Sequence, residues 1–340
     1  MPDNTFADRL CKAIIEKKSV LCCGLDPQIR YMPPPLVRRA IENHGRTFEA
    51  VGWLFTMFNR AIIDAVADIV PVVKPQLAFY EAYGPAGLAA FADTVAYAKN
   101  MGLLVVADAK RGDGGDTADA YADTYLGQVP FFGEGDDPMA LTTRWSQLRV
   151  DCMTVHGYIG EDCVMRFINR GVKLHGTGIF VVTKTSFKPN SRLEQLETSP
   201  GNEEQGVEPT KVWQELAKMV SEWGAGTEGA CGLRNVGVVM GATYPTDAPK
   251  MREILPNSIF LIPGFGGQGA TADDAVTGIR PDGLGGIVND SRRLLYAWQD
   301  KKGAHQCAPE KYADAARLTA IDGRDALMAA LKKANKWPHG

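Results

Sequence analysis

The chain has 340 residues, of which 45% are hydrophobic and 23% are charged, a composition typical of a soluble globular protein. Its net charge of −3 at pH 7 and its lack of a long basic run give no electrostatic case for binding nucleic acid. No apolar run approaches the roughly 20 residues that a membrane-spanning helix needs, and the charged N-terminus lacks the apolar block of a signal peptide. We therefore expect a cytoplasmic protein that binds neither membranes nor nucleic acid.

The seven cysteines are an odd number and show no spacing typical of zinc ligands. Cys22 and Cys23 are adjacent within one apolar run, and Cys152 lies in another. The five histidines form no pair with metal-ligand spacing. We therefore expect buried thiols in a reducing compartment, without disulfides and without a bound metal.

Short apolar runs recur along the chain, and most are followed by segments with helical spacing. Each run is almost continuously apolar, which is typical of strands buried on both faces of a parallel sheet. The eight runs cover residues 19–26, 69–74, 103–110, 151–157, 178–185, 235–243, 258–264 and 283–290. Eight such units predict the α/β class and a (β/α)8 TIM barrel, with residues 1–340 forming one domain. An open doubly wound sheet is the competing architecture.

Helix candidates lie between the strands, for example at 49–68, 86–102 and 210–224. Residues 5–17 are expected to form a helix that caps the bottom of the barrel. The tail, 308–335, is expected to form the last helix, with four residues packed inward: Ala315, Leu318, Leu327 and Leu331.

Two stretches are longer than the minimal repeat requires, and they predict extended loops after strands three and five. Residues 127–149 lengthen the third unit, and residues 187–207 follow the fifth strand with Pro, Gly, Asn and acidic residues. Both are expected at the C-terminal ends of strands, where barrel enzymes carry their active-site loops. The second stretch is either a lid over the site or a solvated insertion.

Charged residues end two neighbouring strands of the predicted barrel. Asp108 and Lys110 are two residues apart, so their side chains point to the same side of the strand. Lys74 ends the preceding strand, and Asp113 follows in the next turn. Burying these charges is costly unless they pair with one another. The cluster is therefore either a structural ion-pair network or a catalytic site.

Two segments after the last strands favour a phosphate site. PGFGGQGAT, residues 263–271, can present several backbone N–H groups to an anion. NDSRRLLYA, residues 289–297, supplies arginine, which binds phosphate through two parallel hydrogen bonds. The loops after strands seven and eight are the usual phosphate site of such barrels. A phosphorylated small molecule would thus have its reacting end at the Lys and Asp cluster.

Taken together, six motifs resemble the orotidine 5′-monophosphate decarboxylase family, in its longer-chain branch. They are GLDP, VVKPQLAFYE, DAKRGD with Thr117 after it, TKTS, PGFGGQGA and NDSRRLLYA. The resemblance implies the conversion of orotidine 5′-monophosphate to uridine 5′-monophosphate and CO₂ in de novo pyrimidine biosynthesis, without a metal or cofactor. One departure is Gly114, which stands where the family usually has an apolar residue.

The resemblance also implies roles for individual residues. Lys110 would protonate C6 of the pyrimidine, Asp108 would face the substrate carboxylate, and Lys74 would hold Asp108 and a ribose hydroxyl. Asp113, the fourth catalytic residue, would reach the neighbouring subunit's site with Thr117, which implies a homodimer. Asp26 would bind the ribose, Thr185 and Ser186 the pyrimidine edge, and Gln268 and Arg292 the phosphate, with Arg293 as the alternative to Arg292. The implied substrate-binding set is Asp26, Lys74, Gln76, Thr117, Thr185, Ser186, Pro263, Gln268, Ser291 and Arg292.

Other functions remain open at this point. A related barrel decarboxylase would use magnesium on a keto-sugar phosphate, and an aldolase would use Lys110 as a Schiff-base nucleophile. An aldolase lysine works as a free amine, which the neighbouring aspartates oppose. A non-catalytic barrel that binds nucleotide as a sensor is a third, non-enzymatic possibility.

Overall fold

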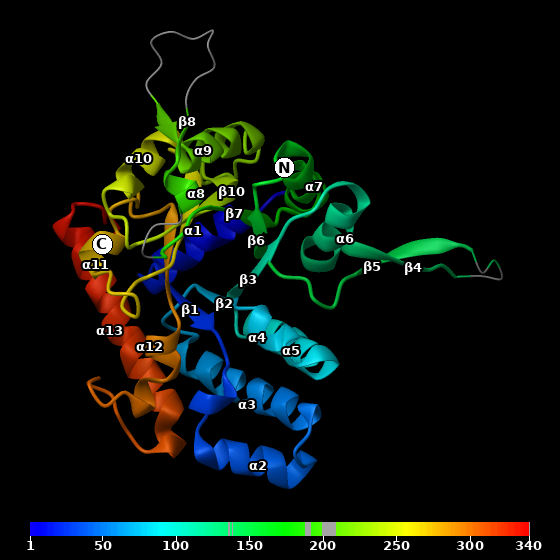
Figure 1. Cartoon of the computed structure of the whole chain (residues 1–340), viewed down its shortest axis with the longest axis vertical. Helices are drawn as coiled ribbons and strands as arrows, with labels where there is room; N and C mark the ends of the chain where they lie inside the picture. Colours follow the sequence, from blue (N-terminus) through cyan, green and yellow to red (C-terminus); the bar gives the residue numbers. More distant parts are fainter. Residues whose placement is uncertain (135–136, 138, 188–191, 199–208, 340) are drawn as a thin grey trace.

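A computed structural model describes residues 1–339 except 135–136, 138, 188–191 and 199–208. Within these residues, eight parallel strands close into a barrel in the order β1-β12-β11-β10-β7-β6-β3-β2 (Figure 1). The strands are β1 (Leu21–Leu25), β2 (Val72–Pro75), β3 (Leu104–Arg111), β6 (Cys152–His156), β7 (Gly178–Lys184), β10 (Arg234–Met240), β11 (Ser258–Ile262) and β12 (Gly286–Asp290). Because β12 pairs with β1, the predicted TIM barrel is confirmed and the open sheet is wrong.

Helices surround the barrel on its outside (Figure 1). They are α1 (Phe6–Lys17), α2 (Pro34–His44), α3 (Phe48–Val66), α4 (Ala78–Glu81), α5 (Gly84–Asn100), α6 (Gly115–Leu126), α7 (Glu161–Phe167), α8 (Arg192–Gln195), α9 (Val212–Trp223), α10 (Asp247–Ile254), α11 (Ala272–Ala275), α12 (Arg292–Leu295) and α13 (Tyr312–Lys333). Two short strands, β8 (Glu197–Thr198) and β9 (Thr210–Lys211), pair with each other. In the described part of the chain, no helix combines the length and apolar character needed to cross a membrane.

Helix α1 caps the N-terminal end of the barrel, as expected. It begins at a capping box, in which the Thr5 hydroxyl accepts from the Asp8 N–H and the Asp8 carboxylate accepts from the Thr5 N–H. The Ala7 N–H then donates to the Asn235 side chain near the start of β10, over 2.8 Å. Contacts at the first residues of the strands thus hold α1 at the end opposite the predicted site.

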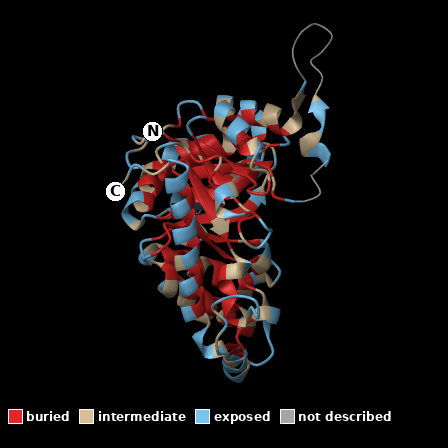
Figure 2. Cartoon of the chain, turned by 90° about the vertical axis from the view of Figure 1, so that its left-hand side faces the viewer, coloured by how far each residue is buried: buried red, intermediate tan, exposed pale blue. Residues whose placement is uncertain are grey.

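The core fills the inside of the barrel and the layer between strands and helices (Figure 2). In α13, Ala315, Leu327 and Leu331 are buried as expected, but the expectation for Leu318 is wrong because its exposure is 47%. At about 3.6 residues per turn, the buried positions of α13 share one face and Leu318 falls on the opposite face.

The extra residues of the third unit form an antiparallel ribbon of β4 (Gln128–Phe132) and β5 (Leu141–Trp145), which projects from the barrel (Figure 1). They follow α6, not β3, so the expectation that they lie at the C-terminal end of a strand is wrong. Because α6 runs back along the barrel, its last residue lies near the strand N-termini. The ring of Trp145 accordingly contacts His175, which precedes β7 (centroids 4.8 Å apart). The ribbon therefore starts at the end opposite the predicted site.

Candidate active site

Asp108, at the end of β3, is the centre of a hydrogen-bonded cluster. Its Oδ2 accepts from Lys74 Nζ at 3.0 Å and from Gln76 Nε2 at 2.8 Å. Its Oδ1 accepts from Lys110 Nζ at 2.5 Å and from Thr154 Oγ1 at 2.9 Å. The structure therefore brings together the lysines and the aspartate that the sequence predicted. Sequence reasoning missed Thr154, although it is the hydroxyl residue in the otherwise apolar part of the run DCMTVHG.

Burial and pairing set the charges in this cluster. Burial alone would raise the pKa of Asp108, but the two ammonium groups of Lys74 and Lys110 outweigh it and hold that pKa well below its usual range. Burial would likewise lower the pKa of Lys74, but the carboxylates of Asp108 and Asp26 raise it above its usual value. Asp108 and Lys74 are therefore both charged at neutral pH, although their exposures are only 8% and 4%.

The backbone at Lys110 has an unusual conformation. Its φ of 47° lies in the left-handed region, which residues with a Cβ rarely adopt and which costs about 1–3 kcal/mol. The Lys110 N–H donates to Thr154 Oγ1 over 2.9 Å, so the same hydroxyl that donates to Asp108 also holds this backbone. The pairing of β3 with β6 shifts register between Ala107 and Arg111. This distortion lets the Lys110 amine fold back onto Asp108.

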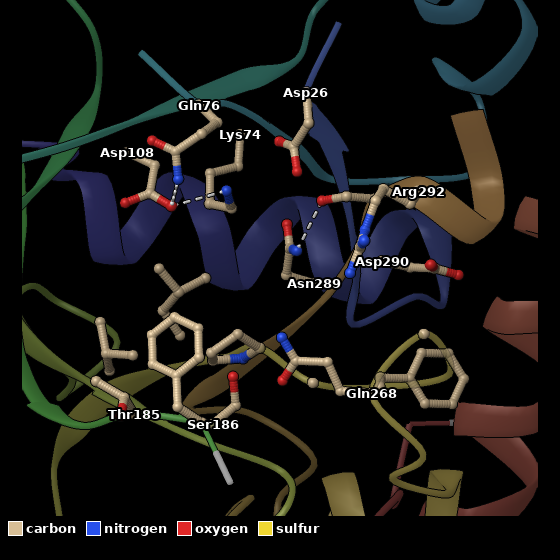
Figure 3. Close-up of a pocket in the computed structure, with 18 of the residues that line it drawn as sticks. Asp26, Lys74, Gln76, Asp108, Thr185, Ser186, Gln268, Asn289, Asp290 and Arg292 are labelled. Carbon is tan, nitrogen blue, oxygen red and sulfur yellow. Dashed lines mark hydrogen bonds and ion pairs between the residues drawn. The ribbon is translucent and has the colours of Figure 1, made fainter. Parts of the chain in front are cut away.

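The cluster lies on one side of a pocket at the C-terminal ends of the strands (Figure 3). Figure 3 shows Thr185 and Ser186 across the pocket from Asp108, with Gln268 and Arg292 at a third side. The lining includes all but two of the predicted residues: Asp26, Lys74, Gln76, Asp108, Lys110, Thr185, Ser186, Pro263, Gln268, Ser291 and Arg292. Residues from six strand ends therefore meet in one cavity.

Asp26, at the end of β1, has an unusual environment. Its carboxylate points toward the space between Lys74 and Arg292 (Figure 3). Its Oδ1 is buried and accepts no hydrogen bond from the described residues. Burial raises the pKa of Asp26, although Lys74 and a hydrogen bond from Ser291 oppose that rise. A carboxylate oxygen without a partner at a pocket wall is suited to bind a hydroxyl group of a ligand.

The glycine-rich segment after β11 forms a tight loop at the opposite wall. Gly264, Gly266 and Gly269 have φ values of 106°, 65° and 89°, a region that favours glycine. Gln268 lies between them and is exposed. The N–H groups of Gly266, Gly267, Gly269 and Ala270 donate to carbonyls of the loop itself, whereas the Gln268 N–H has no partner among the described residues. That several N–H groups of the loop bind an anion stays a prediction.

The two adjacent arginines differ in their surroundings. Arg293 Nη2 lies 2.5 Å from Asp290 Oδ2, whereas Arg292 is exposed and forms no ion pair within the described residues. Arg292 is therefore the arginine with a guanidinium available to a ligand in the pocket.

Thr185 and Ser186 are held by two neighbouring segments. The Glu194 carboxylate of α8 accepts from the Thr185 hydroxyl at 2.8 Å and from its N–H at 3.1 Å. The other oxygen of Glu194 accepts from Lys184 Nζ at 3.1 Å, and the Lys184 side chain is fully buried. Thr243 Oγ1 donates to the Ser186 carbonyl. Sequence reasoning missed the Lys184–Glu194 pair, for which the lysine at the end of an apolar strand was the signal.

Asp113 and Thr117 are not brought into the pocket. Both are exposed, and the Asp113 Oδ1 accepts from the adjacent Gly114 N–H over 2.8 Å. The Asp162 carboxylate lies 3.3 Å from the point where a Cβ on Gly114 would stand, so a larger residue there would crowd it. The predicted lid, 187–207, falls mostly outside the described residues, and its described part forms α8 and β8.

All seven cysteines are free, and five of them are buried, as expected. Across the part of the chain that the structure describes, no group of three or more His, Cys, Asp or Glu residues is arranged to hold a metal ion. The expectation of chemistry without a metal stays a prediction.

Comparison with known proteins agrees with this geometry. The sequence profile of the orotidine 5′-phosphate decarboxylase / HUMPS family matches residues 19–285, which carry the charged cluster and the glycine-rich loop. The chain belongs to this family. An orotidine 5′-phosphate decarboxylase of Rhodopirellula baltica is 36% identical over 95% of this chain and 99% of its own. One from Clostridium perfringens is 32% identical, with coverage of 96% and 100%.

A solved structure also resembles this chain in its fold. The OMP decarboxylase of Leishmania donovani superposes with a TM-score of 0.64 at 26% identity. It covers 95% of this chain and 100% of its own.

Proposed function

We propose that this protein decarboxylates orotidine 5′-monophosphate to uridine 5′-monophosphate and CO₂, a step of de novo pyrimidine biosynthesis. The observation that carries the proposal is the Lys74–Asp108–Lys110 cluster, in which the Lys74–Asp108 ion pair is buried and Lys110 pairs with the same carboxylate at the wall of a pocket. Membership of the family supports the same reaction. The proposal requires no metal and no cofactor.

The substrate would bind with its two ends at opposite walls of the pocket. Its phosphate would accept hydrogen bonds from the glycine-rich loop, Gln268 and Arg292. Asp26 and Lys74 would bind the ribose hydroxyls. Thr185 and Ser186 would face the pyrimidine edge, with Gln76, Pro263 and Ser291 completing the lining. This orientation puts C6 of the ring at Asp108 and Lys110.

The chemistry follows from the charges at that position. The bond between C6 and the carboxylate carbon breaks, CO₂ leaves, and the electron pair remains on C6. The Lys110 ammonium stabilises this carbanion as it forms and then transfers a proton to C6. Asp108 holds Lys110 within 2.5 Å and faces the substrate carboxylate, so departure of CO₂ relieves the repulsion between two carboxylates.

A second subunit would complete the site. Asp113 is assigned to catalysis and Thr117 to substrate binding, but both lie outside the pocket of their own chain and are exposed near the start of α6. We therefore infer a homodimer in which each protomer supplies these two residues to its neighbour's pocket. The exposed carboxylate of Asp113 is suited to reach across such an interface.

The test is to follow the loss of absorbance as orotidine 5′-monophosphate is consumed, with EDTA present throughout. Turnover that persists in excess chelator supports the proposal and excludes a magnesium-dependent decarboxylase. Lys110→Ala should abolish turnover while uridine 5′-monophosphate still binds, and Lys173→Ala, at an exposed lysine far from the pocket, should change neither.

Two outcomes would redirect the assignment. A covalent adduct of Lys110 with a keto-sugar phosphate, trapped by borohydride, would indicate the aldolase. Tight binding of uridine 5′-monophosphate without any turnover would indicate a nucleotide sensor.

A further inference from the structure

Arg293 connects three parts of the fold beneath the glycine-rich loop. Its guanidinium pairs with Asp290 at the end of β12, with Nη2 and Oδ2 2.5 Å apart. The Asp290 side chain is only 2% exposed and Arg293 is 31% exposed. The guanidinium carbon lies 5.1 Å from the centre of the Phe265 ring, a cation–π distance. Arg293 is thus fixed between the strand end and the loop.

The loop backbone lies directly against this side chain. A Cβ built on Gly266 would stand 2.8 Å from Arg293 Nε and 3.0 Å from its Cδ. The loop's own backbone hydrogen bonds are all short-range. Gly266 and Gly267 N–H donate to the Ala270 and Phe265 carbonyls, and Gly269 and Ala270 N–H donate to the Gly266 and Gly264 carbonyls. Glycine-rich backbone has many accessible conformations, so a loop of this kind needs an external contact to hold one of them.

Helix α13 supplies the space for the guanidinium. Gly323 lies inside this 22-residue helix, where glycine costs about 1 kcal/mol relative to alanine. A Cβ at that position would stand 3.1 Å from Arg293 Nη2. The glycine therefore weakens the helix but allows Arg293 to occupy its place.

We propose that Arg293 is a positioning residue, which holds the glycine-rich loop in the conformation that binds the phosphate of a nucleoside monophosphate. Its own charge is directed to Asp290, so the phosphate is left to Arg292 and the loop N–H groups. Arg293 also lines the pocket, and in this proposal it acts by holding the loop. This inference rests on the proposed function, and it extends the phosphate site to Asp290, Arg293 and Gly323.

The test compares the binding of uridine 5′-monophosphate with that of uridine, by calorimetry, because the two differ only in the phosphate. Arg293→Met should weaken nucleotide binding by about tenfold, because the loop is no longer held in its binding conformation, and leave uridine binding within about twofold. Arg293→Lys, which keeps the charge near Asp290, should recover part of the loss.

Gly323→Ala keeps the proposal testable if Arg293→Met fails to fold. The added methyl group raises helix propensity, which offsets part of the cost of displacing the guanidinium from Asp290, and the displacement should weaken nucleotide binding by about two- to fivefold. Lys332→Ala, at an exposed position of the same helix, is the matched control and should leave both affinities unchanged.

The outcomes separate the inference from the proposed function. Equal weakening of nucleotide and nucleoside, or no change in either for folded Arg293→Met and Gly323→Ala, would overturn the positioning role alone. A wild-type protein that binds uridine 5′-monophosphate no better than uridine would overturn the proposed phosphate site and this inference with it.

Discussion

Lys74 Nζ and Asp108 Oδ2 lie 3.0 Å apart on adjacent strands, and both side chains are at least nine-tenths buried. Neither charge would be stable at this depth without the other. Lys110, whose side chain is 40% exposed, pairs with the same carboxylate from the pocket side. Asp108 therefore forms ion pairs with two lysines at once, the buried Lys74 and Lys110, which a ligand in the pocket can reach.

Asp108→Asn should reduce stability as well as activity. The substitution leaves the buried Lys74 ammonium without its carboxylate, and breaking a buried pair costs about 3–5 kcal/mol. Urea unfolding measures this free energy. Asp93→Asn is the control, because its pair with Arg60 is well exposed and should contribute less than about 1 kcal/mol.

The stabilising effect of Asp108 should depend on pH in the acid range. Because its pKa in the folded protein lies below the ordinary 3.8, the unfolded chain binds the proton first as the pH falls. The contribution is therefore complete above the unfolded pKa and is lost as the pH drops toward the folded one. Unfolding free energies of wild type and Asp108→Asn, measured from pH 7 to pH 3, should approach each other as the pH falls below about 4, without meeting, because the folded pKa lies below that range. Parallel curves would contradict the lowered pKa.

Thr154→Val should impair the site without changing its shape. Valine is close to threonine in size, but it removes the hydroxyl that accepts from Lys110 N–H and donates to Asp108. The expected cost is about 1–3 kcal/mol, in stability or in kcat, because buried groups lose their partners. Thr154→Ser should restore most of the loss, and equal defects in both variants would argue against the role of the hydroxyl.

The Lys184–Glu194 pair should show strong coupling in a double-mutant cycle. Glu194→Gln leaves the fully buried Lys184 ammonium with the Tyr244 ring, 3.9 Å away, and should cost about 3–5 kcal/mol. Adding Lys184→Met to that variant removes the unpaired charge and should recover part of the loss. Glu197→Gln, an exposed residue in the same segment, should have no effect on unfolding in urea.

Mixed dimers should test the shared site. If Lys110 and Asp113 act in one pocket from different chains, a heterodimer of Lys110→Ala and Asp113→Ala contains one intact pocket. Random reassortment of two inactive variants should then restore about a quarter of wild-type activity. Titration of one variant with the other measures this value, and a mixture that stays inactive would indicate sites within single chains.

The barrel could be predicted from the sequence because its strands are continuously apolar and are punctuated by helical segments. The pocket wall could also be predicted, since Lys74, Asp108 and Arg292 follow strands whose ends must meet in a closed barrel. The hydrogen-bond and ion-pair partners of individual polar side chains could not be predicted in the same way. Thr154 bonds to Asp108, 46 residues away in the sequence, and Glu194 bonds to Lys184 and Thr185, which are 10 and 9 residues away. A single polar residue in a sequence does not indicate which residue will be its partner.

The errors have a similar physical origin. Leu318 is apolar and has helical spacing to its neighbours, yet spacing alone does not say which face of α13 meets the barrel. The ribbon of β4 and β5 was expected at the pocket because residues 127–149 were assigned to a loop, whereas α6 ends before them and returns the chain to the other end.

The left-handed backbone of Lys110 has an evolutionary consequence. A glycine would adopt this φ of 47° without strain, so random mutation at this position includes an exchange that relaxes the backbone. A strained residue persists at such a site only if selection for its side chain outweighs selection for stability. Among descendants freed from the need for turnover, position 110 should therefore drift toward residues that tolerate this φ, such as asparagine and glycine.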